Sequence, residues 1–314
     1  MQPTPFALLF PGQGSQALGM GRELANTFPV AGETFAQADK ILGFSLSALA
    51  WEGPEESLND TLNTQPALLT HSVAALRVFQ EKCPGWQPAF VAGHSMGELS
   101  ALVAAGCLDF ADALVLARRR GELMKQAGEA SPGGMAAILG LDIPTLEALC
   151  TQASTPDEIV QVANDNCPGQ VVISGTDAAL ERVLPLIQAA GARRAKRLAV
   201  SIAAHSPLMA HAQAGFNEAV QAAPIADPQV PLVGNVTARA LITAQAVRED
   251  LQAQLHSRVR WTESVQAMAA QGVTLFIELG SGDVLTGLIK RIDKQVSQTA
   301  LGAPADFEKF LSAG

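Results

Sequence analysis

The sequence predicts an α/β protein in which a small unit of the order β-α-β-β-α-β is inserted into a larger α/β body. Three observations support this fold class. Short apolar runs that end at Gly or Pro, typical of buried parallel strands, alternate with stretches of helical periodicity. Polar, glycine-bearing loops follow two of these runs, and the segment Ser131-Pro-Gly-Gly134 marks a change of character. At 314 residues the chain is long enough for one large domain or two smaller ones.

The part of the chain before the inserted unit begins with a strand. Phe6–Phe10 is apolar throughout and is stopped by Pro11 and Gly12, and a polar loop follows at 13–16. Further along, the pattern predicts helical segments within 17–50, a helix over 66–80 with Pro66 near its first turn, a strand over 89–92, and helices over 97–105 and 109–127.

The inserted unit has the split β-α-β arrangement of a small ferredoxin-like domain. Its expected elements are a strand at 135–139, a helix at 143–152, strands at 159–163 and 170–174, a helix at 178–190 and a strand at 194–200. We therefore expect a small domain over 130–200 and a larger domain formed by 1–129 and 201–314. The larger domain continues with helices after Pro207, strands at 230–233 and 274–278, a loop at 279–282 and a helix over 283–292.

Composition excludes several classes of protein. Hydrophobic residues make up 48% of the chain and charged residues 16%, which excludes a disordered chain. The 21 Lys and Arg against 30 Asp and Glu give a net charge of −9, so binding to nucleic acid or to an anionic membrane is not expected. We see no signal peptide and no apolar stretch long enough to cross a membrane, and we expect a cytoplasmic protein. No cysteine pair has the CxxC spacing of a zinc site, so no metal is expected.

The most specific motif is Gly93-His94-Ser95-Met96-Gly97, between an expected strand and an expected helix. This is the context of a G-x-S-x-G nucleophile elbow, in which the turn is so tight that a β-carbon at either flanking position would clash. Ser95 would then sit at a helix N-terminus, where backbone N–H groups favour developing negative charge. A chance serine in a turn is the less favoured interpretation.

A nucleophilic serine needs a base, and the chain offers five histidines. His94 adjoins Ser95 on a sharp turn, where neighbouring side chains point apart, and His71 lies in an apolar helix. His205 follows the last strand of the small unit, in a loop at a domain junction, where sites tend to lie. We therefore predict His205 as the base, with His211 as the alternative.

Arginines 118–120 lie next to one another in an expected helix. Three adjacent side chains on a helix point in different directions, so at most one or two of them face a cleft. A solvated helix face is the ordinary interpretation of such a run, and spacing alone does not single out Arg120.

Together these motifs resemble those of the malonyl-CoA:acyl carrier protein transacylases, the acyltransferase family of fatty-acid and polyketide synthesis. The resemblance covers almost the whole chain. Its segments are Phe10-Pro-Gly-Gln13-Gly-Ser-Gln16, Thr64-Gln65-Pro-Ala-Leu68, Gly93-His-Ser-Met-Gly97-Glu98, Arg120-Gly121, Asn166-Cys-Pro-Gly-Gln170, His205, Trp261-Thr-Glu-Ser-Val265 and Glu278-Leu-Gly-Ser-Gly282. The resemblance implies an α/β-hydrolase-like large domain with an inserted ferredoxin-like small domain.

The family's residue roles can be carried over position by position. Ser95 matches the nucleophile that becomes the acyl-serine, His205 the base, and Arg120 the arginine that binds the free carboxylate of the malonyl group. The backbone N–H groups of Gln13 and Met96 match the oxyanion hole. Two polar residues near the pocket, Gln65 and Asn166, match positions of less definite role.

The resemblance also implies how the histidine is oriented and what the enzyme binds. A backbone carbonyl from the segment 258–260, before Trp261, takes the place of a carboxylate, although Ser257 and Arg258 replace the family's usual Asn-Pro. Expected partners are malonyl-CoA and a holo acyl carrier protein. No cofactor is expected, because the phosphopantetheine belongs to the carrier, and a monomer is the family's usual state.

An acidic carrier requires a local basic patch on this acidic chain. The candidates are Arg193, Arg194, Lys196 and Arg197 on the small domain, and Lys290, Arg291 and Lys294 on the late helix, with ordinary solvated charges as the alternative interpretation. Acyl choice is a further expectation. Ala204, before the histidine, stands where bacterial malonyl enzymes often carry Ser, which suggests malonyl preference with some tolerance for a 2-methyl group.

Several functions remain alternatives at this stage. A serine hydrolase that releases stalled acyl groups would share the elbow, although such relatives tend to lack the arginine found here as Arg120. A non-catalytic binding module is disfavoured by the presence of Ser95, His205 and Arg120 together. Within the transferases, the chain could serve fatty-acid synthesis, a polyketide assembly line in trans, or malonate decarboxylase as its loading subunit.

Overall fold

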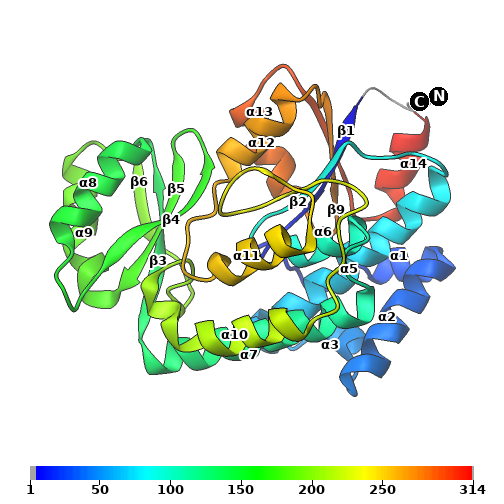
Figure 1. The fold of residues 1–314 in the computed structure, drawn as a ribbon, viewed down its shortest axis with the longest axis horizontal. Coiled ribbons are helices and arrows are strands. Elements are labelled where there is room, and N and C mark those ends of the chain that lie inside the picture. The colour runs from blue at the N-terminus through cyan, green and yellow to red at the C-terminus, as the bar shows by residue number, and fades with distance from the viewer. Residues whose placement is uncertain (1–4, 313–314) are drawn as a thin grey trace.

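The computed structural model describes residues 5–312. It is a mixed α/β structure with two separate sheets, and the smaller sheet with its helices forms the green lobe at the left of Figure 1. No helix in the described residues is both long and apolar enough to span a membrane.

The larger sheet has six strands in the order β10-β9-β1-β2-β7-β8. The strands are β1 (Phe6–Phe10), β2 (Phe90–Gly93), β7 (Leu232–Val233), β8 (Ala240–Leu241), β9 (Leu275–Leu279) and β10 (Ser297–Leu301). All neighbours run parallel except β7 and β8. Every residue of β1 is buried, as its apolar run predicted, because helices cover both faces of the sheet. The loops after β1 and β2 therefore leave the same edge of the sheet, side by side.

The helices of the larger body surround this sheet. They are α1 (Arg22–Thr27), α2 (Pro29–Leu42), α3 (Leu46–Glu52), α4 (Glu55–Asn59), α5 (Thr61–Lys82), α6 (Gly97–Ala104), α7 (Phe110–Ala130), α10 (Ala210–Ala222), α11 (Ala244–Gln254), α12 (Trp261–Ala270), α13 (Val284–Ile292) and α14 (Pro304–Ser312). The predicted helical stretch at 17–50 is divided into three helices. The sequence patterns had not resolved α11, α12, α14 or β10 as separate elements.

The smaller sheet is antiparallel, in the order β4-β5-β3-β6. Its elements follow the predicted β-α-β-β-α-β order: β3 (Gly133–Leu139), α8 (Ile143–Ala153), β4 (Val160–Cys167), β5 (Gln170–Thr176), α9 (Asp177–Ala189) and β6 (Arg194–Arg197). Helices α8 and α9 pack on this sheet and enclose an apolar core of its own.

The last strand of the small unit is shorter than predicted. The sequence favoured a strand over 194–200, whereas β6 ends at Arg197. The backbone N–H of Leu198 still bonds Met135 O at 2.9 Å, and after that contact the chain leaves the sheet. This early exit carries the chain back to the larger body, where it reaches the buried His205.

The free edge of β4 joins the small sheet to the larger body. Val259 donates a backbone hydrogen bond to Ala163 O and accepts one from Asp165 N, both at 2.9 Å, which makes a short parallel bridge. The amide nitrogen of Gln161 donates to the carbonyl oxygen of His205 at 2.8 Å. The segment 257–260 and the histidine loop are therefore both held against β4.

Candidate active site

Ser95 lies on a sharp turn between β2, which ends at Gly93, and α6, which begins at Gly97. Its φ of 52° is in the left-handed region, which a residue with a side chain rarely adopts. The flanking glycines make the turn possible. A β-carbon on Gly93 would lie 2.0 Å from the Gly97 carbonyl group, and one on Gly97 would lie 2.2 Å from Phe10 O. The predicted sharp turn between a strand and a helix is therefore present around Ser95.

The structure brings Ser95 and His205 together as the sequence predicted. Ser95 Oγ lies 2.8 Å from His205 Nε2. On the other side of the ring, His205 Nδ1 lies 2.9 Å from Gln254 O and 3.1 Å from Ser257 O. Two carbonyl oxygens can only accept, so Nδ1 carries the proton and the bare Nε2 accepts from the serine hydroxyl.

The orienting carbonyls come from a slightly earlier position than expected. The resemblance pointed to the segment 258–260, and that position is wrong: the acceptors are Gln254 at the end of α11 and Ser257 in the following turn. In the short bridge to β4, Val259 O is instead occupied by Asp165 N. A backbone carbonyl, and not a carboxylate, nevertheless contacts the ring.

The imidazole of His205 is held in its neutral form. Burial and, to a smaller extent, the positive charge of Arg120 together lower the pKa of His205 to about 3, against the opposing effects of the two carbonyls. A neutral imidazole at ordinary pH is the form that can take a proton from the serine hydroxyl.

Arg120 is the one arginine of its run that enters the site. Its side chain is 1% exposed, whereas Arg118 and Arg119 both form ion pairs with Glu122. Arg120 Nη1 donates to Gln65 Oε1 at 2.9 Å, and Nη2 donates to Gln254 Oε1 at 2.8 Å and to Ser95 Oγ at 3.3 Å.

The guanidinium of Arg120 forms no ion pair with any of residues 5–312. Burial lowers its pKa to about 10, which leaves it charged at neutral pH. A buried cation held only by two neutral amides and a hydroxyl lacks the compensation that buried charges usually have. The site is therefore complementary to an anionic ligand beside Ser95.

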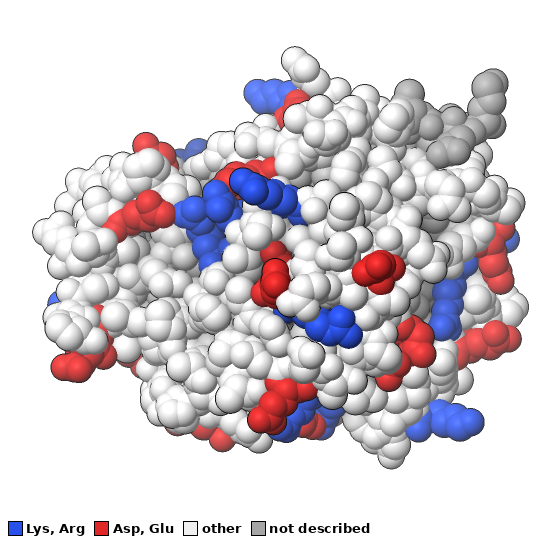
Figure 2. Space-filling view, viewed as in Figure 1, with Lys and Arg blue, Asp and Glu red and all other residues white. Residues whose placement is uncertain are grey.

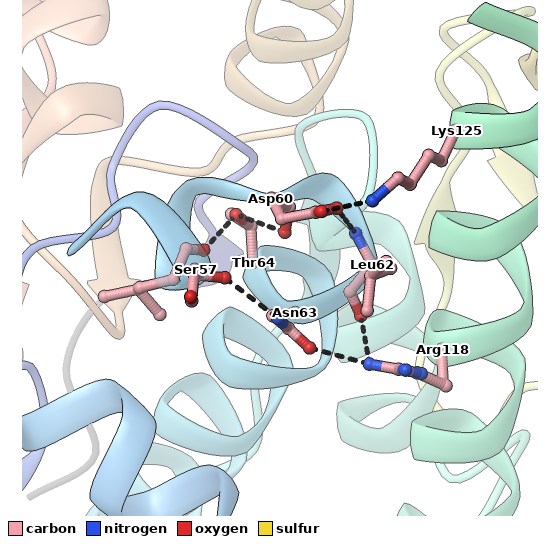
Figure 3. Close-up of polar contacts among 8 residues, drawn as sticks. Ser57, Asp60, Leu62, Asn63, Thr64, Arg118 and Lys125 are labelled. Atoms are coloured by element: carbon pink, nitrogen blue, oxygen red, sulfur yellow. Dashed lines mark hydrogen bonds and ion pairs between the residues drawn. The ribbon is translucent and has the colours of Figure 1, made fainter. Parts of the chain in front are cut away.

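Polar contacts of Arg118 and Lys125 join α7 to the start of α5 (Figure 3), and these two helices carry Arg120 and Gln65. Pro66 lies inside α5 and not in its first turn as predicted, because the helix begins at Thr61. Proline has no N–H to donate to Leu62 O. Arg118 Nη1 on α7 donates a hydrogen bond to this oxygen instead, at 3.0 Å. Two turns further along α7, Lys125 pairs with Asp60, the N-cap residue of α5.

Two backbone N–H groups lie on the loops beside Ser95. Met96 follows it directly, and Gln13 belongs to the loop after β1. That loop is pressed against the elbow, since a β-carbon on Gly12 would lie 2.4 Å from His94 O. Among the described residues neither N–H donates a hydrogen bond. The side chain of Gln13 accepts from Thr61 Oγ1 at 3.0 Å, away from the serine.

Asn166, like Gln13, forms no hydrogen bond with Ser95, His205 or Arg120. Its Oδ1 lies 2.8 Å from His94 Nε2, and the His94 ring packs edge-on against Trp261 with a centroid distance of 5.5 Å. Asn166 therefore fixes the side chain next to the serine. The alternative base, His211, is exposed on α10, and His71 is buried in α5 with Nε2 2.9 Å from Gly302 O.

The sequence did not indicate three buried polar residues that lie around the backbone of Ser95: Asn235, Gln254 and Glu98. Asn235 Oδ1 accepts from the backbone N–H of Ser95 at 2.8 Å, and Gln254 Nε2 donates to Ser95 O at 3.1 Å. Both amides also donate to Glu98 Oε2, at 2.8 Å for Asn235. Only Glu98 belongs to one of the segments that carry the resemblance, and its position in the first turn of a helix does not predict this contact. No cluster of metal-ligating side chains occurs within the described part of the chain.

The geometry defines a class of protein: an α/β protein in which a serine on a strained turn lies beside a carbonyl-oriented histidine and a buried arginine. Comparison with known proteins agrees with this class. Residues 7–303 match the acyl transferase domain family, and the chain belongs to that family.

Curated relatives and solved structures are similar over nearly the full length. The malonyl CoA-acyl carrier protein transacylase of Bacillus subtilis is 46% identical over 305 residues, which is 97% of this chain and 96% of the relative. The Escherichia coli K12 protein of the same name is 47% identical over 304 residues, 96% of this chain and 97% of the relative.

Among solved structures, an acyl carrier protein S-malonyltransferase from Vibrio cholerae is 46% identical with a TM-score of 0.93 and covers 97% of this chain and 99% of its own. A malonyl-transacylase in complex with a type II PKS acyl-carrier protein is 45% identical with a TM-score of 0.95, and the match covers 99% of this chain and 100% of that chain.

Proposed function

We propose that this enzyme transfers the malonyl group from malonyl-CoA to the phosphopantetheine thiol of an acyl carrier protein. The observation that carries the proposal is the buried guanidinium of Arg120, which forms no ion pair in the described residues and lies 3.3 Å from Ser95 Oγ. Malonyl-CoA is a thioester with a free carboxylate. When Arg120 binds that carboxylate, the thioester carbonyl is placed beside the serine.

The two glutamines leave the arginine ready for this ligand. Arg120 Nη1 uses one N–H for Gln65 Oε1 and keeps its second. Nη2 uses one N–H for Gln254 Oε1 and directs the other at Ser95 Oγ, while the buried Nε–H has no hydrogen-bond partner among the described residues. The planar guanidinium can therefore still donate to both oxygens of a carboxylate. Because the amides are neutral, they orient the guanidinium without neutralising its charge.

In the first half-reaction, Ser95 Oγ attacks the thioester carbonyl carbon and its proton passes to His205 Nε2. The carbonyl oxygen becomes an oxyanion, which the backbone N–H groups of Met96 and Gln13 stabilise. The C–S bond then breaks, the histidine returns the proton to the departing CoA thiol, and the malonyl group remains as an ester on Ser95.

In the second half-reaction, the phosphopantetheine thiol of the carrier loses its proton to His205 and attacks the malonyl ester. Collapse of the second oxyanion breaks the C–O bond, and the proton returns to Ser95 Oγ. The two substrates use the same site in turn, so the kinetics are ping-pong. The chain needs no cofactor of its own, because the carrier supplies the phosphopantetheine.

We also propose how the chain divides into two domains and which fold each of them has. The large domain, 1–129 and 201–314, is α/β-hydrolase-like, with its nucleophile after a parallel strand. The small domain, 130–200, is ferredoxin-like, as its strand order β4-β5-β3-β6 suggests. We further propose a monomer that acts in the cytoplasm, a reducing compartment in which four unpaired buried cysteines persist.

The carrier needs a local basic surface on an acidic enzyme. On the face shown in Figure 2, the Lys and Arg side chains lie among the Asp and Glu side chains, and no patch of a single charge covers this face. On β6 and the turn before it, Arg193, Arg194 and Lys196 are exposed and form no ion pair in the described residues, whereas Arg197 pairs with Asp177. On α13, Arg291 is engaged with Gln170. We propose the first three residues as the carrier contact.

Incubation with radiolabelled malonyl-CoA, with and without holo-carrier, tests the proposal. The expected result is label held on the enzyme and passed to the carrier when it is added. Release of the label as free malonate in both conditions would instead establish a hydrolase. Carriers from fatty-acid synthesis, a polyketide assembly line and malonate decarboxylase, compared side by side, identify the pathway served.

A further inference from the structure

Glu98 is a buried carboxyl group that the reaction above does not use. It lies in the first turn of α6 with no exposed surface. Its Oε2 accepts hydrogen bonds from Asn235 Nδ2, at 2.8 Å, and from Gln254 Nε2. Because an amide has one donor end and one acceptor end, an acceptor at this point fixes the orientation of both amides.

Those two amides hold both peptide groups of Ser95. Asn235 Oδ1 accepts from Ser95 N, and Gln254 Nε2 donates to Ser95 O. Ser95 has a φ of 52°, a strained conformation that persists only where its surroundings enforce it. Glu98 is thus linked to the nucleophile through two independent contacts.

Gln254 extends the connection to the rest of the site. Its Oε1 accepts from Arg120 Nη2 at 2.8 Å, and its backbone oxygen lies 2.9 Å from His205 Nδ1. If the Gln254 amide were reversed, an N–H group would face the guanidinium and the arginine would lose one of its two holding contacts. The acceptor at Glu98 Oε2 prevents this reversal.

The remaining oxygen of Glu98 indicates where its proton lies. Glu98 Oε1 is buried and accepts no hydrogen bond from the described residues. Asp250 of α11 is the carboxyl group that acts on Glu98, raising its pKa both through its charge and through a side-chain hydrogen bond. Two carboxyl groups in contact inside a protein do not both ionise. Asp250 accepts from Val236 N and from the N–H and hydroxyl of Thr237, which stabilise its charge, so the shared proton belongs to Glu98.

The charges around the pair are consistent with this assignment. Burial and the neighbouring Asp250 raise the pKa of Glu98 well above its usual range, while Arg120 of α7 opposes the shift. The guanidinium does not bond Glu98 directly, since its terminal nitrogens contact Gln65, Gln254 and Ser95.

We propose that Glu98 is a positioning residue that acts as a neutral carboxylic acid: its O–H donates a hydrogen bond to Asp250, and its other oxygen orients the amides of Asn235 and Gln254 around Ser95 and Arg120. The inference rests on the proposed function. A neutral Glu98 leaves the charge of Arg120 available to the malonyl carboxylate, whereas an ionised Glu98 would compete with the substrate for it.

The variant Glu98→Gln separates a neutral role from a charged one. The glutamine oxygen can accept from both amides and its NH₂ group can donate to Asp250, so the variant mimics a protonated acid. We expect acylation by malonyl-CoA, and its KM, to stay within about threefold of the wild type, and Glu98→Leu to lose about tenfold to a hundredfold in acylation rate because two buried amide donors lose their acceptor. The exposed Glu249→Gln on α11 is the matched control and should leave both values unchanged.

Infrared difference spectroscopy of the wild type against Glu98→Gln reads the proton directly, whatever the stability of the leucine variant. The expected result at neutral pH is the C=O stretching band of a protonated carboxylic acid in the wild type. Carboxylate bands in its place, or a glutamine variant as impaired as the leucine variant, would overturn the inference. A wild type that forms no malonyl-serine would refute the proposed function instead, and the infrared spectrum would still decide the protonation of Glu98.

Discussion

Arg120 Nη2 lies 3.3 Å from Ser95 Oγ, so the only arginine of its run that is buried points at the serine on the elbow. Residues 25 positions apart meet here because α7 packs against α5 and α6. A carboxylate bound by this guanidinium is held within reach of the nucleophile. The contact between Arg120 and Ser95 therefore links selection of the substrate to the chemical step.

Loss of the arginine should remove selection for a carboxylated substrate. We expect Arg120→Gln to lower kcat/KM for malonyl-CoA by about 10²–10³, since breaking a buried charge pair costs about 3–5 kcal/mol. The acetyl-CoA rate should change far less. Steady-state kinetics with both thioesters check this, and Arg119→Gln, whose partner is Glu122 on the surface, serves as control. Equal losses for the two substrates would contradict carboxylate binding by Arg120.

The pH dependence of acylation should lack the usual histidine inflection. The pKa of His205 is lowered from 6.5 to about 3, mainly by burial and then by Arg120. We expect kcat/KM for malonyl-CoA to show no fall centred near pH 6.5. In Arg120→Gln one depressing charge is gone, so the acid limb should move to higher pH. A wild-type limb near pH 6.5 would show that His205 is not held neutral.

The lowered pKa of His205 also predicts how the free energy of unfolding depends on pH. A histidine whose pKa is lower in the folded state contributes stability above its unfolded pKa, and this stability is lost as pH falls from about 6.5 toward 3. Chemical denaturation from pH 7 to pH 4 should therefore give a steeper decline for the wild type than for His205→Gln. Parallel curves would contradict the assigned shift.

The elbow glycines should tolerate no side chain. We expect Gly97→Ala to abolish acylation and to destabilise the fold, because its β-carbon would lie 2.2 Å from Phe10 O in the neighbouring strand. Gly287→Ala in α13 is the matched control. It meets nothing within 4 Å and should stabilise the protein by about 0.5–1 kcal/mol. Thermal unfolding and labelling of both variants make the comparison, which fails if Gly97→Ala remains active.

Charge reversal on β6 should weaken the carrier selectively. We expect the combined change of Arg193, Arg194 and Lys196 to Glu to raise the KM for the carrier about tenfold at low salt, and to leave the KM for malonyl-CoA within twofold. Lys40→Glu, exposed on α2, is the control. An unchanged KM for the carrier would show that these three residues do not contact it.

The alanine before His205 should affect acyl choice. Ala204 is buried and precedes His205 in the chain, and Ala204→Ser adds a hydroxyl at this position. We expect the substitution to raise the preference for malonyl-CoA over methylmalonyl-CoA by about threefold to tenfold, because one methyl group is worth about 1–3 kcal/mol of discrimination. Direct competition between the two thioesters measures it, and a wild type that already prefers methylmalonyl-CoA would overturn the expectation.

The sequence could predict features that depend on neighbouring residues. The strand, turn and helix around Ser95 are set by Gly93 and Gly97, and the β-α-β-β-α-β order of the small unit follows from local periodicity. The extent of β6 was wrong, because the chain leaves the sheet to bring His205 back to the larger body. Nothing local marks that exit.

Long-range contacts account for the rest. Asn235 lies 140 residues after Ser95 and Gln254 lies 159 residues after it, and neither belongs to a motif with a chemical signature. Local spacing could not select Arg120 over Arg118, because the choice depends on which face of α7 packs against α5. Pro66 was placed too near the helix start, because Arg118 satisfies the carbonyl that the proline leaves free.

The central claim is that Ser95 carries the malonyl group between the two substrates. Intact-protein mass spectrometry after brief incubation with malonyl-CoA, without carrier, tests this most directly. The account predicts a wild type heavier by one malonyl group, an unmodified Ser95→Ala, and loss of the adduct when holo-carrier is added. An unmodified wild type, or a Ser95→Ala variant that carries the same adduct, would contradict it.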